Sequence, residues 1–444
     1  MEPFIFTLPR GKSMKRVHHY LNSRTRYNLD VIKGEKLDAV LLDTFNSEIA
    51  RSGQVLLQVG QTLLLINLLS CRIVEQHAAS PWSFLTELAI GPVVAALKTV
   101  SRLRAFMVVS KLTLRCDRGL LLDDEGKTRA RLHVFAFFRK KRSLLLGITQ
   151  SLRGYDRAHR DLQHHLTDMG GAAVRDAGEI LRCLKIKQRE YSAKPDICIA
   201  PENPIKDSAT TIIRTYLDVA RQNEAGILAD YDTEFLHDYR VSFRKVRSVL
   251  SLFKGVYSSE QTNELKREFA DLMKHTNSLR DLDVYLLDRE DYFRMVPESS
   301  HDGVRILFDI MAVKRRVEHK KICRLIKSKS YRQLVGGWVE LFSNDEYLSS
   351  GSRAMKSSDR YVARLILNRY RKVCRIARRI NETTADDAVH ELRIHCKKLR
   401  YLMEFSLPFF PKKKVKILLR PLKRLQDNLG RFNDYSVQQV CFFL

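Results

Sequence analysis

The chain has few cysteines, none of them in a CxxC pair, and no uninterrupted apolar run long enough to cross a membrane. This cysteine pattern excludes a disulfide framework and predicts buried free thiols in a reducing compartment. The first residues lack the apolar segment of a secretory signal. The most hydrophobic window, residues 55–74, is interrupted by Gly60 and Asn67 and predicts two strands around a turn at Gly60. We therefore expect a cytoplasmic protein that does not enter a membrane.

Acidic residues are also scarce, because 51 Asp and Glu stand against 78 Lys and Arg, which gives a net charge of +27 over 444 residues. Residues 1–206 carry 33 basic and 20 acidic side chains, and residues 207–444 carry 45 and 31. Such a charge predicts an anionic partner, which could be nucleic acid, an anionic membrane or a phosphate polymer. The apolar fraction of 44% is enough for a folded core, so the chain is not wholly disordered.

The first part of the chain has the pattern of an α+β domain. Short apolar segments separated by glycines predict strands, and an acidic turn at residues 123–126 separates two of them. We expect an antiparallel sheet or barrel, with helices over residues 156–167 and 172–187. The predicted strands cover residues 4–8, 27–32, 39–42, 55–59, 63–68, 104–115 and 131–138.

The composition changes near residue 190. Residues 191–206 contain Pro195, Pro201 and Pro204 without helical periodicity, which predicts a linker. Residues 207–444 carry long amphipathic patterns and no strand pattern, so they predict an all-α domain of one or two helical bundles. The predicted organisation is therefore an α+β domain over 1–190, a linker over 191–206 and a helical domain over 207–444. The helix breakers expected in the last part are Pro297, Pro408, Pro411 and Pro421.

The helical part contains an internal repeat. The segment from His237 to Arg247 aligns without gaps on the segment from His390 to Arg400, at an offset of 153 residues. The shared pattern is H-[DE]-x-R-[VI]-x-x-[RK]-K-[VL]-R. The same offset places Leu272 on Leu425, which indicates that a whole helical hairpin is duplicated.

Each copy of the motif predicts a helix with a basic stripe. His237, Arg240, Arg244 and Arg247 fall within an arc of about 80° on a helical wheel, opposite an apolar face that includes Phe243. A basic helix face is often simply exposed to solvent and binds nothing. However, an ordinary solvated face usually mixes both signs of charge, and these stripes contain no acid. The stripes therefore favour an anion-binding surface. The second stripe consists of His390, Arg393, Lys397 and Arg400.

These motifs resemble the CHAD family, the conserved-histidine α-helical domains. The resemblance covers residues 207–444 and includes Leu279-Arg-Asp-Leu-Asp-Val284 and Leu422-Lys-Arg-Leu-Gln-Asp-Asn-Leu-Gly430. It implies two helical bundles related by a pseudo-twofold axis, a basic channel, and binding of inorganic polyphosphate, with association with polyphosphate granules in some members. By matching position, it implies binding by His237, Arg240, Arg244, Lys245, Arg247, Arg280, His390, Arg393, Lys397, Lys398, Arg400, Lys423 and Arg424. Basic faces elsewhere add Arg364, Arg371, Arg375, Arg378, Lys416, Arg420 and Arg431 as further candidates.

The first part of the chain is similar to a diverged CYTH domain, the triphosphate-tunnel fold. The similar segments include Leu42-Asp-Thr-Phe45 and Leu103-Arg-Ala-Phe106. CYTH enzymes open with a Glu-x-Glu-x-Lys strand that helps to hold a catalytic metal, and residues 1–10 lack that motif. Residues 133–138 also carry no acid where the family supplies metal carboxylates. We therefore expect a domain without catalysis, without a bound metal and without a cofactor.

Three alternatives remain at this stage. The CYTH-like part could hydrolyse triphosphate or polyphosphate, or the chain could bind RNA or polyanions in general. RNA readers stack bases on exposed aromatic side chains, whereas Tyr239, Phe243 and Phe253 are predicted to be buried. His237 and His390 could contact phosphate or could be structural. The sequence does not specify the oligomeric state or a preferred chain length of polyphosphate.

Overall fold

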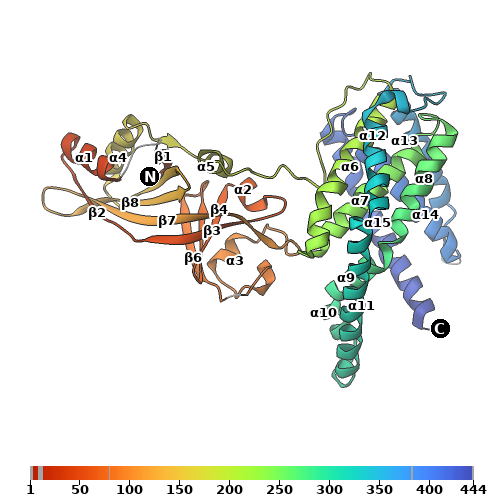
Figure 1. The fold of residues 1–444 in the computed structure, drawn as a ribbon, viewed down its shortest axis with the longest axis horizontal. Helices are drawn as coiled ribbons and strands as arrows, with labels where there is room; N and C mark the ends of the chain where they lie inside the picture. The colour runs from red at the N-terminus through yellow and green to blue at the C-terminus, as the bar shows by residue number, and fades with distance from the viewer. Residues whose placement is uncertain (1–3, 9–13, 80, 382–383, 443–444) are drawn as a thin grey trace. The chain divides into compact units, whose positions relative to one another are not determined.

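The computed structural model of the chain describes residues 4–8, 14–79, 81–381 and 384–442, without the side chains of residues 412, 431 and 433–442. The chain divides into two compact units, residues 1–191 and residues 192–444. The first unit is built on a β-sheet and the second is helical, as Figure 1 shows from red to yellow and from green to blue. Among the described residues, no helix combines the length and the apolar character that crossing a membrane requires.

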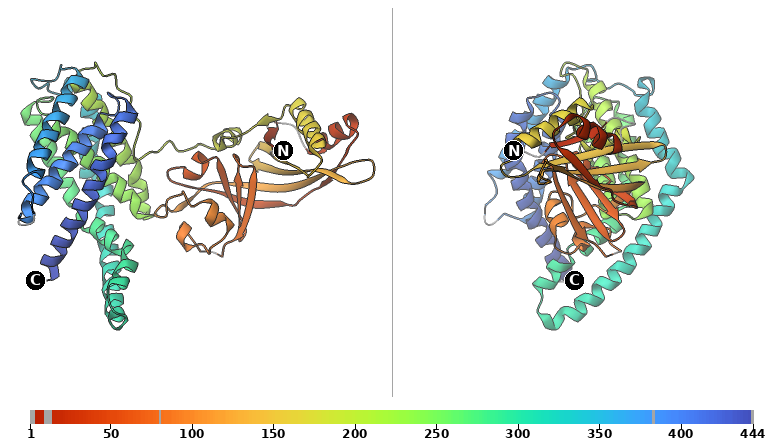
Figure 2. Two further views of the ribbon diagram at one scale, coloured as in Figure 1. Left: turned by 180° about the vertical axis from the view of Figure 1, so that it is seen from behind. Right: turned by 90° about the vertical axis from the view of Figure 1, so that its left-hand side faces the viewer.

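The first unit contains an antiparallel sheet, which agrees with the predicted α+β fold. The strand order is β10-β1-β9-β8-β7-β3-β4-β5-β6, and β2 pairs with β7. The sheet curls (Figure 2) but its edge strands β6 and β10 are not paired with each other in the described residues, so it is an open half-barrel. The strands are β1 (Phe4–Leu8), β2 (Asn28–Ile32), β3 (Lys36–Thr44), β4 (Gln54–Val59), β5 (Thr62–Asn67), β6 (Arg72–His77), β7 (Phe106–Leu122), β8 (Thr128–Arg139), β9 (Arg142–Ser151) and β10 (Ala172–Ala173).

Short helices cover this sheet. Leu162 and Leu166 of α4 share a core with Val17 and Leu21 of α1. Ile180 of α5 belongs to a second core with the strands. The predicted helix over residues 172–187 is shorter in the structure, because residues 172–173 pair with β1 and Asp176 caps α5 by accepting a hydrogen bond from the Gly178 amide. The helices are α1 (Met14–Arg24), α2 (Glu48–Arg51), η1 (Leu85–Glu87), α3 (Pro92–Ala96), α4 (Asp156–Asp168) and α5 (Ala177–Cys183).

Both turns expected in this unit are present. Gly60, with φ +58°, joins β4 to β5, and it takes a left-handed conformation that glycine adopts at little cost. Between β7 and β8, Gly126 has φ +74°, and Asp123 Oδ1 accepts hydrogen bonds from the amides of Glu125 at 3.1 Å and Lys127 at 2.8 Å. The side chain of Asp123 thus fixes the turn that the acidic sequence predicts.

The cysteines are free in the described residues, but their predicted burial is wrong for most of them. Cys396 is buried, whereas Cys116, Cys183 and Cys198 are exposed. Apolar periodicity locates the buried face of an element, and a thiol next to that face can still point into solvent.

The helices of the second unit repeat at the predicted offset. Adding 153 converts both ends of α7, residues 233 and 252, into the ends of α14, residues 386 and 405. The same shift converts the starts of α6 and α8, residues 205 and 259, into those of α13 and α15, residues 358 and 412. The helices are α6 (Ile205–Ala229), α7 (Thr233–Leu252), α8 (Ser259–Lys274), α9 (Asn277–Leu287), α10 (Arg289–Met295), η2 (Glu298–Ser300), α11 (His301–Lys327), α12 (Lys329–Ser343), η3 (Asp345–Tyr347), α13 (Ser358–Ala377), α14 (Asp386–Phe405) and α15 (Lys412–Phe442).

The core of the first copy is aromatic. The rings of Phe269 and Trp338 stack at 3.8 Å, and the ring of Phe243 lies 5.9 Å from Trp338. Tyr239, Phe243 and Phe253 are all buried, as their side of the wheel predicts. Pro421 lies inside α15 and does not end it, which differs from the expected break. Residues 192–204 contain no helix or extended strand, and α6 begins at Ile205.

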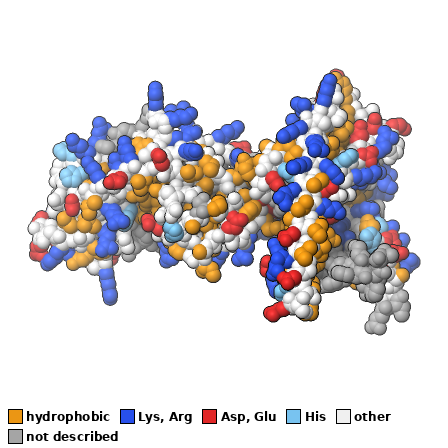
Figure 3. Space-filling model, turned by 60° about the horizontal axis from the view of Figure 1, so that its bottom comes forward, with side chains coloured by type: hydrophobic (Ala, Val, Ile, Leu, Met, Phe, Trp, Pro, Cys, Tyr) orange, Lys and Arg blue, Asp and Glu red, His pale blue; other side chains and the backbone are white. Residues whose placement is uncertain are grey.

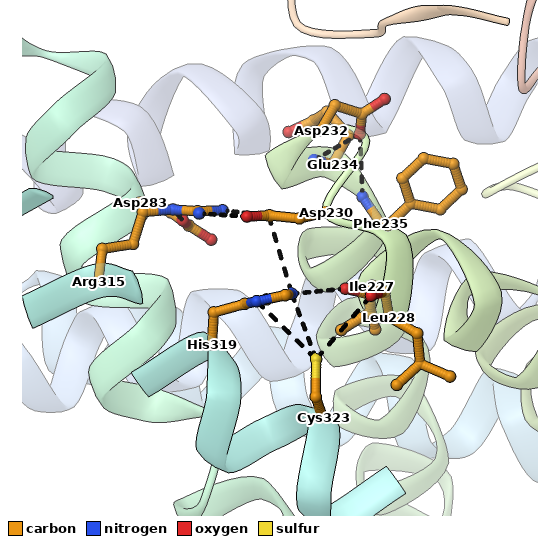
Figure 4. A network of polar contacts seen from close by, with 10 residues as sticks. All are labelled: Ile227, Leu228, Asp230, Asp232, Glu234, Phe235, Asp283, Arg315, His319 and Cys323. Carbon is orange, nitrogen blue, oxygen red and sulfur yellow. Dashed lines mark hydrogen bonds and ion pairs between the residues drawn. The ribbon is translucent and has the colours of Figure 1, made fainter. Parts of the chain in front are cut away.

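A polar network ties α6, α9 and α11 together (Figure 4). Asp230, which caps the C-terminus of α6, receives two hydrogen bonds from Arg315 at 2.7 and 2.8 Å. Nε of Arg315 donates to Asp283 at 2.7 Å, and Nε2 of His319 lies 2.7 Å from the Ile227 carbonyl oxygen. One arginine therefore connects three helices.

Candidate anion-binding site

The helix that carries the first basic stripe, α7, has a well-defined start. Asp232 caps it and accepts hydrogen bonds from the amides of Glu234 at 3.0 Å and Phe235 at 3.2 Å. Because its apolar side is buried, the stripe lies at the edge of the core, where Arg244 is exposed and Arg240 and Arg247 are half-buried. This placement agrees with the amphipathic pattern.

The turn between α8 and α9 orients Arg240. Its guanidinium donates to Thr276 Oγ1, to Asn277 Oδ1 at 3.0 Å and to the Met273 carbonyl at 3.4 Å. Burial and the charges of Arg244 and Arg280 together lower the pKa of Arg240 to about 10, and the charge of Asp281 opposes this shift. Arg240, Arg244 and Arg280 therefore form a crowded group of cations, which we call the first-copy cluster.

Three of the predicted ligand residues keep buried donors without a hydrogen bond. Nη1 of Arg280, Nε of Arg393 and Nε of Arg400 are buried and have no hydrogen-bond partner among the described residues, although Nε of Arg400 lies 3.4 Å from Glu404 Oε1. An unpaired buried donor on a charged group is costly, and an anion that accepts from it removes that cost. These atoms support the idea that the basic stripes bind an anion.

Lys245 does not belong to this surface. It is only 6% exposed, and its Nζ donates to the Tyr216 hydroxyl at 2.8 Å and lies 4.0 Å from Glu404 Oε2. Burial lowers the pKa of Lys245 to about 8, although the charge of Glu404 opposes that shift. Lys245 thus has structural contacts that the wheel of α7 does not show, because α14 supplies the acid, and its ligand role stays a prediction.

The lowered pKa of Lys245 predicts how the stability of the protein depends on pH, and the Lys245→Met variant tests this. An unfolded lysine keeps its proton up to about pH 10.4, so the unfolded chain binds more protons than the folded chain between about pH 8 and pH 10.4. The stability of the native protein should rise through that window, by about 2–3 kcal/mol, and the variant should lack this rise. Urea unfolding from pH 7 to 10 measures both slopes.

The control for this prediction is Lys320→Met, which removes an exposed lysine. It should keep the native slope. Equal slopes for Lys245→Met and the native protein would contradict the assignment of Lys245 as a buried charged group.

The second copy differs at the equivalent positions. Lys398 corresponds to Lys245, but Arg369 replaces Tyr216, and the position of Glu404 corresponds to Ser251. Burial lowers the pKa of Lys398, and the positive charges of Arg369, Lys372 and Lys254 lower it further. We call Lys254, Arg369, Lys372 and Lys398 the second-copy cluster. The lysine of the first copy thus lies beside Tyr216 and Glu404, whereas cations surround the lysine of the second.

His395 completes this cluster. Arg369 Nη1 lies 2.7 Å from Nδ1 of His395, and since arginine can only donate, Nδ1 accepts. Burial lowers the pKa of His395 to about 4, and Lys372, Arg369 and Lys398 add to the effect. The carboxylate of Glu391 partly neutralises the positive charge of the cluster. Its Oε1 lies 3.4 Å from Nζ of Lys372 and 3.5 Å from Nε2 of His395. The sequence analysis did not identify Lys254, Arg369, Lys372 or His395, because their grouping depends on how α13 packs on α14.

A basic hollow of about 520 Å³ lies next to this cluster. Tyr361 contributes to it, and the Tyr361 hydroxyl donates to the Lys254 carbonyl at 2.8 Å. Among the residues that the structure describes, no acidic side chain lines the hollow. Its lining comprises Arg353, Lys356, Ser357, Arg360, Tyr361, Arg364, Leu365 and Asn368.

Other predicted residues lie elsewhere on the surface. The stripe of Arg371, Arg375 and Arg378 is exposed, and on the wheel of α13 it lies away from Arg369, so it is not part of the cluster. The side chain of Arg431 lies outside those that the structure describes. The exposed predicted residues of α15 are Lys416, Arg420, Lys423 and Arg424.

The stripes are not free of acid in three dimensions. Glu404 continues the second stripe by one turn, and its Oε1 lies 3.4 Å from Nε of Arg400. This corrects the prediction for the C-terminal end of that stripe. His237 is half-buried and His390 is exposed, and both of them and Lys397 interact with other residues.

The sheet unit has a hollow of its own, of about 610 Å³, between β6, β7, β8 and β9. Glu75 and Asp117 are the acids in its lining, and Asp117 is paired with Arg115 at 2.8 Å. Within the described ranges, no three His, Cys, Asp or Glu side chains are grouped so that they could hold a metal ion. Only residues 4–8 of the expected metal-binding strand are described.

A known protein family matches the helical part of the chain. The model of the CHAD domain family matches residues 211–442, which is more than half of the 444 residues. The CHAD domain from the plant Ricinus communis is a similar solved structure, with 21% identity over 56% of this chain and 82% of that one, and a TM-score of 0.46. A search of curated proteins found no match.

Two further solved structures are similar. PptA from Streptomyces chartreusis shares 14% identity over 52% of this chain and 83% of its own, with a TM-score of 0.40. The PH1819 protein from Pyrococcus horikoshii shares 12% identity over 41% of this chain and 99% of its own, with a TM-score of 0.23.

Proposed function

This chain belongs to the CHAD family, and from that premise we propose that it binds inorganic polyphosphate on the cationic surface of its helical unit, without catalysis. Polyphosphate is the ligand that the resemblance implies. It offers one charge on each phosphate unit and no base to stack on, so a binder needs closely spaced cations on a rigid support. The helices α7, α13 and α14 supply such cations. This role would place the protein in the cytoplasm, with an association with polyphosphate granules.

The observation that carries the proposal is the second-copy cluster together with the adjoining basic hollow. Lys254, Arg369 and Lys372 lie close enough to Lys398 to lower its pKa, and Glu391 is ion-paired with Lys372 alone among these cations in the described residues. Bringing these cations together in the folded protein costs free energy because like charges repel, and a bound polyanion would offset that cost. Arginine can bind two phosphate oxygens with its planar fork, while lysine acts as a point charge.

RNA binding and general polyanion binding are the competing functions. The aromatic side chains of α7 are buried, so they offer no platform for bases. We expect long-chain polyphosphate to displace labelled RNA from the full chain, and we expect RNA to displace polyphosphate at least about 10-fold less well at equal charge and fixed salt. A competition measured by fluorescence anisotropy tests this. A preference for RNA would contradict the proposal.

Hydrolysis is the remaining alternative. A phosphate-release assay with triphosphate and polyphosphate, with and without Mg²⁺, tests it on the full chain. We expect no release above the background. Release that depends on Mg²⁺ would overturn the non-catalytic part of the proposal and would leave the binding part in place.

A further inference from the structure

The long helix α11 has two apolar faces. On the inner face, Phe308, Ile322 and Ile326 are buried against the neighbouring helices. On the outer face, Ile306, Ile310, Val313 and Val317 are exposed by 61%, 59%, 53% and 49%. At about 100° per residue, the four outer side chains fall within about 60° of one another and lie opposite the inner ones. We call these four residues the outer stripe.

The outer stripe is a continuous surface. Figure 3 shows hydrophobic side chains along this helix with Lys, Arg and acidic side chains beside them. Ile306, Ile310 and Val313 line a shallow hollow together with Asp309 and Lys314. An ordinary solvated helix has one apolar face and one polar face, so a second apolar stripe indicates a surface that another helix covers.

The spacing of the stripe selects the kind of partner. Its residues follow one another at intervals of four, three and four, which is the a/d pattern of a coiled coil. A stripe with this spacing fits a second stripe of the same spacing. The two helices then interlock their apolar side chains along about 16 Å of the helix axis, at 1.5 Å per residue.

The charged residues beside the outer stripe indicate which helix it binds and whether the two helices run parallel or antiparallel. Asp309 and Arg316 are exposed and lie along the same side of the stripe, seven residues apart. In an antiparallel pair centred between Ile310 and Val313, Asp309 of each copy faces Arg316 of the other, so two opposite-charge pairs form. A parallel pair would place Asp309 against Lys314 of the other copy but also Arg316 against Lys321, so two like-charge pairs would offset the two opposite-charge pairs.

From this complementarity we propose that the outer stripe of α11 binds the outer stripe of a second copy of this chain, with the two helices antiparallel. Four apolar side chains from each copy bury less than the roughly 1,200–2,000 Å² of a standard interface. The net charge of +27 also repels a second copy. The dimer should therefore be weak, with a Kd of about 10 μM or higher, and concentration-dependent.

A charge-swap experiment tests the proposal on the full chain without any polyanion, so its outcome is separate from polyphosphate binding. Sedimentation velocity at protein concentrations up to about 200 μM gives the Kd. Asp309→Arg and Arg316→Asp should each weaken association at least about 10-fold, because each places two like-charge pairs in the dimer. The double variant, Asp309→Arg with Arg316→Asp, should return to within about 3-fold of the native Kd, since it restores both pairs in reverse.

The apolar part of the interface has its own test. Ile310→Asp should abolish the dimer, whereas the control Ile417→Asp, at a residue 70% exposed on α15, should leave it intact. Circular dichroism verifies that each variant is folded. A monomer at every concentration would overturn the proposal. This holds also if the α11 amides of the monomer are protected from hydrogen exchange, which would indicate that the stripe binds the sheet unit of the same chain. A dimer that Ile310→Asp leaves unchanged, or charge variants without recovery in the double variant, would also overturn it.

Discussion

Replacing Arg369, Lys372 and Lys398 together by glutamine is expected to weaken polyphosphate binding at least about 100-fold. Each charge-assisted hydrogen bond to phosphate contributes about 1.5–3 kcal/mol before screening, and even about 1 kcal/mol from each of three contacts amounts to about 3 kcal/mol, or a factor of about 150. The change also leaves Glu391 without its partner Lys372, so the Glu391 carboxylate repels the polyphosphate that the lysine attracted. Titration of the full chain with labelled polyphosphate at physiological salt measures the effect.

The same helix provides a matched control. Changing Arg371, Arg375 and Arg378 to glutamine also removes three positive charges, two from α13 and one from its C-cap residue, all at exposed positions. These side chains are solvated, so we expect a loss of less than about 5-fold. Equal losses for the two triple variants would contradict the cluster as a site and would indicate non-specific attraction by the net charge. Circular dichroism separates weaker binding from a loss of fold.

The first copy offers a second comparison. Lys245 and Lys398 occupy equivalent positions, yet Lys245 donates to Tyr216 and lies near Glu404, whereas Lys398 lies among cations. Removing the lysine should therefore lower polyphosphate affinity in the second copy and leave it unchanged in the first. This comparison tests the hypothesis that the lysine of one copy joins α7 to α14 and that the lysine of the other copy binds the ligand.

Periodicity and internal repetition carry much of the information about the helical unit. The ungapped alignment predicts that α7 and α14 are equivalent, and the two helices begin and end at equivalent residues. The burial of Phe243 and Tyr239 also follows from the wheel. These features are local, because each depends on residues within one helix.

The features that the sequence did not reveal depend on contacts between distant segments. Glu404 reaches Lys245 across 159 residues, and Arg369 reaches His395 from another helix. A wheel drawn for one helix contains neither contact. In the sheet unit, β9 was not predicted because it is buried on both faces, and without alternation an apolar run does not distinguish a strand from a buried helix.

The network around Arg315 carries the second large prediction, which concerns stability. Asp283 is buried, with 1% of its side chain exposed, and Nε of Arg315 is its hydrogen-bond donor at 2.7 Å. Burial raises the pKa of Asp283, although the charge of Arg315 opposes the shift. Arg315→Met would leave this buried carboxylate without its ion-pair partner, and the free energy of unfolding should fall by about 3–5 kcal/mol at pH 7.

The loss should depend on pH in a defined direction. Without Arg315, the folded-state pKa of Asp283 rises further above its unfolded value of about 3.9, so the folded variant binds more protons than the unfolded one. Its stability should therefore increase, relative to the native protein, as the pH falls from 7 towards 4.5. Urea unfolding followed by the helical circular dichroism signal measures this difference at each pH.

Two further variants separate the buried charge from lost packing. Adding Asp283→Asn to Arg315→Met removes the unpaired carboxylate, and we expect it to recover at least half of the lost stability at pH 7 and to abolish the dependence on pH. Arg324→Met, at an exposed position of the same helix, should change stability by less than about 0.5 kcal/mol. If Arg315→Met costs less than about 1 kcal/mol, or costs the same at pH 4.5 as at pH 7, then Arg315 does not hold α6, α9 and α11 together by neutralising a buried acid.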